Sequence, residues 1–228
     1  NTDEKETQVL ITLQDEAKKK TPKILTPKET ILEQKREVSL KEEKDNNRYY
    51  VYVKGEVVLT TDSVSDAIIA ANSQMGVVIG ENQQYVWKRS RKTAQAAFND
   101  IVVGEEDSGA GSIAQCVNAI LEKEEINISV SALISQGETP KQILLNTLKD
   151  ATVLDLTGCT VDEILYYVSN GYPVFAMTGS NDAVLVVGYD ANNVVLYDPA
   201  MGQTYKRTTA DADEMFFNAG NIFFTYQK

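Results

Sequence analysis

The sequence of 228 residues contains no histidine. Imidazole is the commonest general base and a common metal ligand near neutral pH, so mechanisms that need it within this chain are excluded. Only two cysteines are present, Cys116 and Cys159, and we expect free thiols because a chain of this size can fill a core without a disulfide. No apolar run approaches the roughly 18 residues of a membrane span. We therefore expect no membrane insertion within the chain, and no cofactor.

Basic residues are outnumbered, with 22 Lys and Arg against 33 Asp and Glu, and the formal net charge is −11. Such a chain repels phosphate backbones and anionic lipid surfaces, so we expect no nucleic-acid partner. The hydrophobic content of 43% is ordinary for a globular protein and suits one domain with a smaller companion. The chain starts at Asn1 instead of Met, as a processed or truncated product would, so we expect a signal or anchor segment upstream.

The first 47 residues are rich in Lys, Glu, Asp and Thr, and they contain two short apolar patches, at Val9–Leu13 and at Ile31–Leu40. This composition favours a solvated tether. The alternative, that the patches are edge strands which pair with a later sheet, stays open.

Residues 48–90 are expected to form a small ββαββ unit. Lys54-Gly55 separates two strand patterns as a hairpin turn does, and the following helix can be capped by Asp62 or Ser63. A second hairpin ends near Trp87, for which core packing is favoured over ligand contact. A unit of this size buries little by itself, so we expect it to pack on its neighbour.

A charged connector over residues 91–107 leads to a larger domain over residues 108–228. Apolar residues at helical spacing predict a helix from Ser112, and capping boxes that begin at Thr139 and Thr160 predict two more. From Val174 onward, strand patterns alternate with turns, apart from one short helix near Asp211. Helices followed by an antiparallel sheet give an α+β fold class.

Four segments of this domain share a pattern with a known family; they are Ser112–Leu121, Gly171–Val174, Asp182–Asp190 and Val195–Pro199. They resemble the nucleophile helix, the "G-x-P-V" strand entry, the "H-a-V-x-V-x-G-y-d" strand and the "D-P" strand end of C39-like peptidases, the bacteriocin-processing branch of the papain-like cysteine peptidases. The resemblance covers about residues 105–228. It implies a papain-like layout and an extracellular or surface-attached protein of a Gram-positive bacterium.

In that family a thiol at a helix amino terminus works with an imidazole from a strand and an orienting carboxylate or amide. By the resemblance, the nucleophile position is Ser112, the imidazole position is Asp182 and the orienting position is Asp198. The oxyanion-stabilising glutamine position falls on Glu106. Cys116 matches a second, structural cysteine one turn later, and its place on the apolar stripe predicts a buried thiol with a raised pKa.

A carboxylate, with an ordinary pKa of about 4, is a poor base for a serine hydroxyl. The resemblance therefore implies a degenerate, catalytically inactive peptidase homologue that binds a peptide or a protein. Three alternatives remain: altered hydrolysis by Cys116 or Ser112, an aspartic dyad of Asp182 and Asp198, and a structural or assembly module. The oxygen-rich segment around Asp190 is more typical of a turn than of a metal site.

Overall fold

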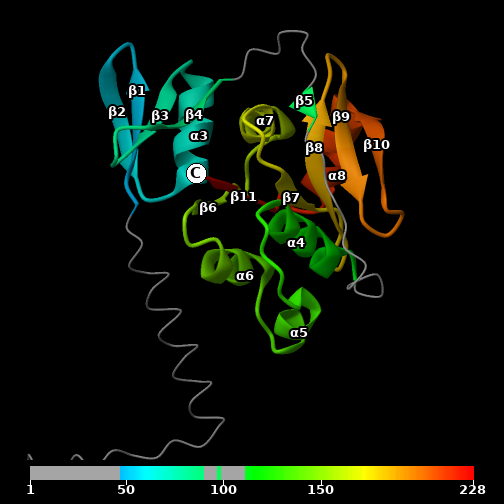
Figure 1. Ribbon diagram of the computed structural model, residues 1–228. Coiled ribbons are helices and arrows are strands. Elements are labelled where there is room, and N and C mark those ends of the chain that lie inside the picture. Colours follow the sequence, from blue (N-terminus) through cyan, green and yellow to red (C-terminus); the bar gives the residue numbers. More distant parts are fainter. Residues whose placement is uncertain (1–46, 90–96, 99–110) are drawn as a thin grey trace, which may run out of the picture. The chain divides into compact units, whose positions relative to one another are not determined.

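The computed structural model describes residues 47–89, 97–98 and 111–228, all within one compact unit, Asn47–Lys228 (Figure 1). The expected tether, apart from residue 47, and most of the expected connector lie outside the described residues. Glu106 lies outside them as well. Within the described part of the chain, no helix is both long enough and apolar enough to span a bilayer.

The first described elements form a four-stranded antiparallel sheet with one helix. The sheet has the order β2-β1-β3-β4. The order of elements is the predicted ββαββ, and the bounds are β1 Tyr49–Val53, β2 Glu56–Thr61, α3 Val64–Ser73, β3 Val77–Gly80 and β4 Tyr85–Lys88.

Local chemistry explains where these elements begin and end. Lys54 and Gly55 both have positive φ, +53° and +88°, which is the backbone of a two-residue type I′ hairpin turn. Of the two candidate caps, Ser63 is the one used, because its hydroxyl accepts from the Asp66 N–H at 3.2 Å. Gly76 follows the helix where a Cβ would lie 2.6 Å from the Tyr52 carbonyl oxygen, so only glycine fits.

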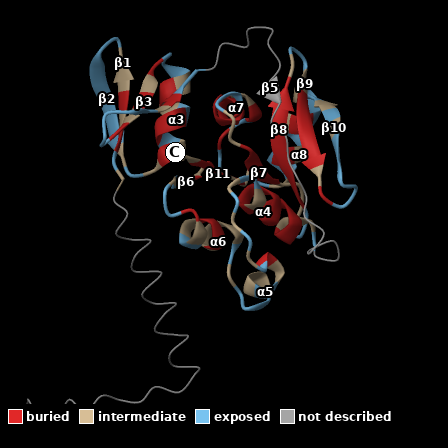
Figure 2. Cartoon of the chain, in the orientation of Figure 1, coloured by how far each residue is buried: buried red, intermediate tan, exposed pale blue. Residues whose placement is uncertain are grey.

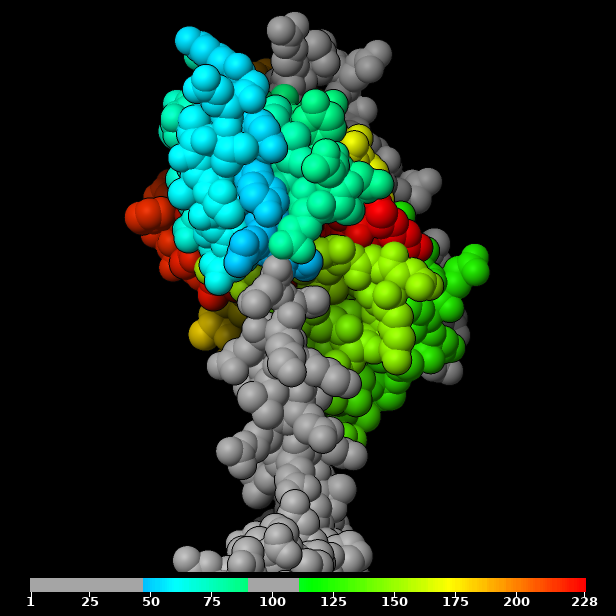
Figure 3. Space-filling model, turned by 90° about the vertical axis from the view of Figure 1, so that its left-hand side faces the viewer, coloured from blue at the N-terminus to red at the C-terminus, as the bar shows by residue number. Residues whose placement is uncertain are grey.

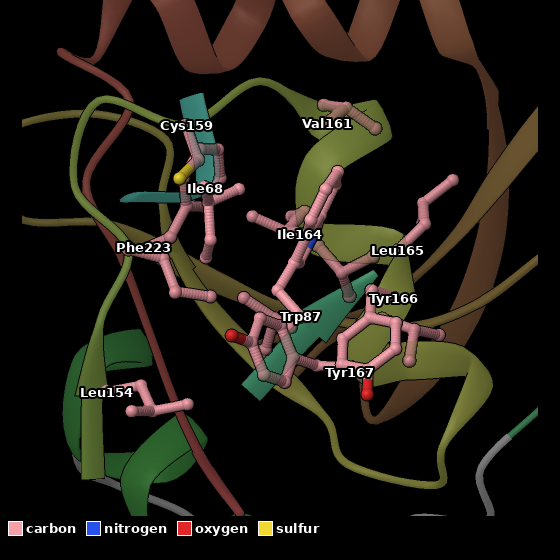
Figure 4. Packing of buried hydrophobic residues seen from close by; sticks show 14 of the residues in the cluster. Ile68, Trp87, Leu154, Cys159, Val161, Ile164, Leu165, Tyr166, Tyr167 and Phe223 are labelled. Atoms are coloured by element: carbon pink, nitrogen blue, oxygen red, sulfur yellow. The ribbon is translucent and has the colours of Figure 1, made fainter. Parts of the chain in front are cut away.

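The small sheet shares a hydrophobic core with the rest of the unit. Trp87, from β4, is 1% exposed, and its indole N–H donates to the Glu163 carbonyl at 2.9 Å. The Asn72 amide donates to the Glu163 carboxylate at 3.0 Å. Figure 4 shows Trp87 and Ile68 packed against the helix that carries Ile164. The expectation that the ββαββ unit packs on its neighbour is confirmed, and Trp87 is a core residue.

The remaining elements are three helices, a strand, a fourth helix and an almost continuous run of strands. Their bounds are α4 Ser112–Lys123, α5 Val130–Ser135, α6 Pro140–Thr147, β6 Thr152–Asp155, α7 Val161–Ser169, β7 Val174–Met177, β8 Ala183–Tyr189, β9 Asn193–Asp198, β10 Gln203–Thr208, α8 Thr209–Asn218 and β11 Phe223–Gln227. The strands form one antiparallel sheet in the order β10-β9-β8-β7-β11-β6, and a short β5, Ala97–Phe98, pairs with β8. The predicted combination of helices and antiparallel sheet is confirmed.

Strand β8 is buried along its whole length, as its red colour in Figure 2 shows. Leu185 and Val187 point into the core that contains α4, whereas Val184 and Val186 point into the core that contains α7. Alternate side chains of a strand point to opposite faces, so both faces of the sheet are covered here. The start of β8, just after Asp182, is thereby held beside α4.

We predict that Trp87→Ala lowers the free energy of unfolding by about 3–5 kcal/mol, because it removes a large buried ring and leaves a cavity. Urea denaturation followed by circular dichroism measures the change. Val57→Ala is the matched control on the same sheet; Val57 is 48% exposed on edge strand β2, so the loss there stays below about 1 kcal/mol. A loss below about 1 kcal/mol for Trp87→Ala would contradict the shared core.

Candidate functional site

The amino end of α4 lies against the start of β8. Ser112, the first residue of α4, is half-buried, and its hydroxyl donates to the exposed Asp182 carboxylate at 3.4 Å. The same oxygen accepts from the Ala183 N–H at 3.1 Å. The structure thus brings together two of the four site residues that the sequence predicts, and it engages the serine hydroxyl as both donor and acceptor.

Asp198 occupies the end of β9, where it stabilises the following turn. One of its oxygens accepts from the N–H groups of Ala200 at 2.9 Å and Met201 at 3.4 Å. Within the described part of the chain, no hydrogen bond joins Asp198 to Ser112 or to Asp182. The three predicted triad positions are therefore not linked as a relay, and Asp198 serves the turn before β10.

Cys116 lies one helical turn after Ser112 and faces the core, with no exposed surface. Burial raises the pKa of its thiol well above the ordinary value, and the negative charge of Asp198 adds to the effect. The thiolate is the reactive form of cysteine, so this side chain is an inert core residue. The prediction of a buried Cys116 is confirmed; Cys159 is also a free, buried thiol whose pKa burial raises.

One neighbour of this site escaped the sequence reasoning. Tyr197 is 3% exposed, and its hydroxyl has no hydrogen-bond partner among the described residues. Burial raises its pKa, and the adjoining Cys116 and Asp198 raise it further. Its position directly before Asp198 was the one sign in the sequence that Tyr197 lies near this site. The alternation of side chains along a strand indicates only that Tyr197 belongs to the core.

The oxygen-rich side chain of Asp190 is used to stabilise the turn in which it lies. One carboxylate oxygen accepts from the N–H groups of Asn192 and Asn193 and from the Asn193 amide, all within 3.0 Å. The other accepts from the Lys206 ammonium at 2.8 Å, which holds the pKa of Asp190 well below its usual range. Among the described residues no group of three His, Cys, Asp or Glu side chains is placed to hold a metal ion.

Comparison with solved structures gives a distant structural likeness. No family model and no curated protein matches the sequence. A crystal structure from Bacillus anthracis, described as a candidate C39-like peptidase, aligns with a TM-score of 0.46 and 15% identity over 60% of this chain and 96% of that chain. A likeness of this size assigns neither a family nor an activity.

We predict that iodoacetamide leaves both cysteines of the native protein unmodified at pH 7.5 and modifies both in urea, because burial keeps each thiol protonated and inaccessible. Mass spectrometry of the intact protein counts the adducts. Ser112→Cys is the positive control, since a thiol there is half-exposed and should react in the native state. One adduct on native wild-type protein, located at Cys116, would show that this face of α4 is open to solvent and does not point into the core.

We also predict that Ser112→Ala lowers the free energy of unfolding by about 1–3 kcal/mol, because the N–H of the buried Ala183 loses its acceptor. Chemical denaturation measures the change. Ser135→Ala at the exposed end of α5 removes only a local bond to the Ser131 carbonyl and should cost less than about 1 kcal/mol. Equal effects of the two substitutions would argue against a structural role for the Ser112 hydroxyl.

Proposed function

We propose that the protein is a noncatalytic C39-like module that binds an extended peptide, or a segment of a protein partner, at the surface of a Gram-positive bacterium. The observation that carries the proposal is the contact of Ser112 with Asp182 and Ala183. A hydroxyl and a carboxylate stand at the two positions where the resemblance places a thiol and an imidazole.

Thiol proteolysis has no support from the residues at this site. The 228 residues contain no histidine to act as a base, and the one cysteine near the position, Cys116, is fully buried. The Ser112 hydroxyl already donates to Asp182 and accepts from a backbone N–H, and a carboxylate is a weak base for serine. Altered hydrolysis is therefore not the function that this geometry favours.

Binding is favoured because the surface next to Ser112 keeps accessible polar groups. Ser180, Asn181 and Asp182 are exposed in the turn before β8, and Ser112 itself is half-buried. The Asp182 carboxylate and the net charge of −11 favour a partner segment that carries Lys or Arg. We propose that such a segment lies across this turn and the start of α4.

A labelled peptide library measured by fluorescence polarisation tests the proposal. Ser112→Arg should weaken the best wild-type binder at least about tenfold, because a long cation would occupy the surface and repel basic segments. Asp182→Asn keeps the size of the side chain and should weaken basic peptides more than neutral ones. Ser73→Arg, at the exposed end of α3, is the matched control and should bind as wild type does.

Two results would oppose the proposal. One is an absence of any binder in a library that includes basic peptides, with the fold of each variant checked by circular dichroism. The other is cleavage of library peptides by the wild-type protein that Ser112→Arg abolishes, which would restore hydrolysis as the function.

A further inference from the structure

Strand β2 is an outer strand of the small sheet, and no described residue pairs with its free side. Figure 3 shows it in cyan beside β1 in blue. Five of its six residues are exposed, and three consecutive ones are apolar: Val57, Val58 and Leu59 are 48%, 46% and 36% exposed. An exposed apolar edge strand is a template on which another strand can pair.

Exposed apolar side chains are concentrated in the small ββαββ unit. Of the eight large ones that are exposed in the described part of the chain, six belong to this unit, and three of the six are on β2. The larger domain contributes Met201 and Phe217. Exposed apolar surface of this kind marks interaction sites on soluble proteins, so β2 is the part of the unit best suited to a partner.

The hairpin decides which backbone groups of β2 point away from β1. Val53 and Glu56 close the two-residue turn, and a pair in that position exchanges both of its backbone hydrogen bonds. The N–H and C=O groups of successive residues point to opposite sides of a strand. Those of Glu56 point toward β1, so those of Val57 point toward the free side.

β2 contains a bulge. Val58 has no partner on β1, and the residues on either side of it lie opposite Tyr52 and Val51. The extra residue shifts the alternation by one position, so Leu59 bonds β1 and the backbone groups of Thr60 point toward the free side. Bulges often protect an edge strand by disturbing its regularity, so the spacing of the outward groups decides whether β2 can pair.

The spacing of the outward groups is that of a regular strand. Val57 and Thr60 are three residues apart in the sequence. They lie opposite Tyr52 and Tyr50, which are two residues apart on β1. Successive hydrogen-bonded positions of an antiparallel pair are also two residues apart. The bulge therefore leaves two outward sites on β2 at the distance that a partner strand requires.

A second copy of β2 matches these two sites. When two copies run antiparallel about a two-fold axis, Val57 of each copy lies opposite Thr60 of the other, and both contacts form at once. Each contact exchanges a pair of backbone hydrogen bonds. The edge that β2 leaves open in one copy is thereby closed by the same edge of the other.

The side chains match in the same register. Val58 of each copy lies opposite Leu59 of the other, so the exposed apolar residues cover one another at the axis. Glu56 lies opposite Thr61, so no two like charges face each other. A shift of the register to the next hydrogen-bonded position, in either direction, would set Glu56 or Asp62 opposite apolar residues.

The charges at the two ends of β2 are complementary in this register. Lys54 precedes the strand and Asp62 follows it, and both are exposed. Asp62 lies opposite Gly55 of the other copy and therefore beside that copy's Lys54, within reach of its long side chain. Backbone pairing alone would accept any extended strand; the apolar centre and the complementary ends select a second copy of this one.

From the outward backbone groups, the exposed apolar centre and the complementary ends, we propose that two copies of the protein pair through β2 about a two-fold axis. The pairing joins two four-stranded sheets into one continuous antiparallel sheet. This surface is separate from Ser112 and does not rest on the function proposed above.

Sedimentation equilibrium of the full chain measures the association. An edge-to-edge contact is small, so a monomer–dimer equilibrium should become visible within a range of roughly 10–500 µM. About 0.3 M NaCl in the buffer screens the repulsion between two copies that each carry a net charge of −11. The mass should rise with concentration toward that of a dimer and no further, because pairing uses up the edge of each copy.

Val58→Lys tests the apolar centre. It should weaken the dimer at least about tenfold, because a charge replaces an apolar contact beside the axis and meets the same charge of the other copy. Tyr85→Lys is the matched control, since Tyr85 is 53% exposed on the opposite edge strand β4, and it should dimerise as wild type does. Circular dichroism and the melting temperature check that each variant is folded.

The charged ends test the register. Lys54→Glu should weaken the dimer about fivefold, because it sets a like charge beside Asp62 of the other copy at both ends. Adding Asp62→Lys to Lys54→Glu exchanges the two charges and should restore wild-type affinity. Lys88→Glu, on exposed Lys88 of β4, makes the same change in net charge and should leave the dimer unaffected.

Three results would overturn the proposal. The first is a monomer at every concentration up to about 500 µM. The second is a dimer that folded Val58→Lys leaves unchanged. The third is a dimer that the exchange of charges weakens as much as Lys54→Glu alone does, which would refute the antiparallel register.

Discussion

The burial of β8 on both faces is the constraint on which the rest of the described unit depends. Leu185 and Val187 face α4, and Val184 and Val186 face α7, so one strand holds a helix against each side of the sheet. Each fully buried aliphatic side chain of this kind contributes roughly 1.5–3 kcal/mol of transfer free energy. Rotation of either helix about its axis would expose such side chains. Each helix is therefore fixed in one rotational orientation.

The rotational orientation of α4 about its axis decides which chemical groups lie at its amino end. The face that packs against β8 carries Cys116 into the core, where burial keeps the thiol protonated. The position one turn earlier carries Ser112, whose hydroxyl binds the first N–H of β8 and the carboxylate just before it. The same packing that stabilises the domain therefore leaves a hydroxyl and a carboxylate, with no thiol and no imidazole, at the surface.

On the other face of the sheet, α7 contacts α3 and β4 of the small sheet unit. Its capping residue Glu163 accepts from the Thr160 N–H and from the Asn72 amide, and its backbone carbonyl accepts from Trp87. Glu163 therefore both caps the start of α7 and binds the small sheet unit to this helix. The buried tyrosines Tyr166 and Tyr167 follow on the same helix.

Much of the local structure was determined by the sequence, because turns, caps and periodicity depend on residues that are close together. The hairpin at Lys54-Gly55, the capping box at Thr139 and the inward face of Cys116 were all predictable in this way. The likeness of four segments to a family indicated which positions to inspect, and it placed Ser112 and Asp182 together, as the structure does. No hydrogen bond in the described part of the chain joins either of them to Asp198, which accepts from the N–H groups of the turn that follows it.

Only the tertiary structure decided the contacts between distant parts of the chain. The placement of β11 between β7 and β6 and the bond from Trp87 to the Glu163 carbonyl join segments far apart in sequence. Such contacts form only when all the packed faces are satisfied at once, and no short pattern of residues encodes that condition. The sequence by itself determined which chemical groups this protein possesses; the packing around β8 decided which of them are buried and which remain available to a ligand.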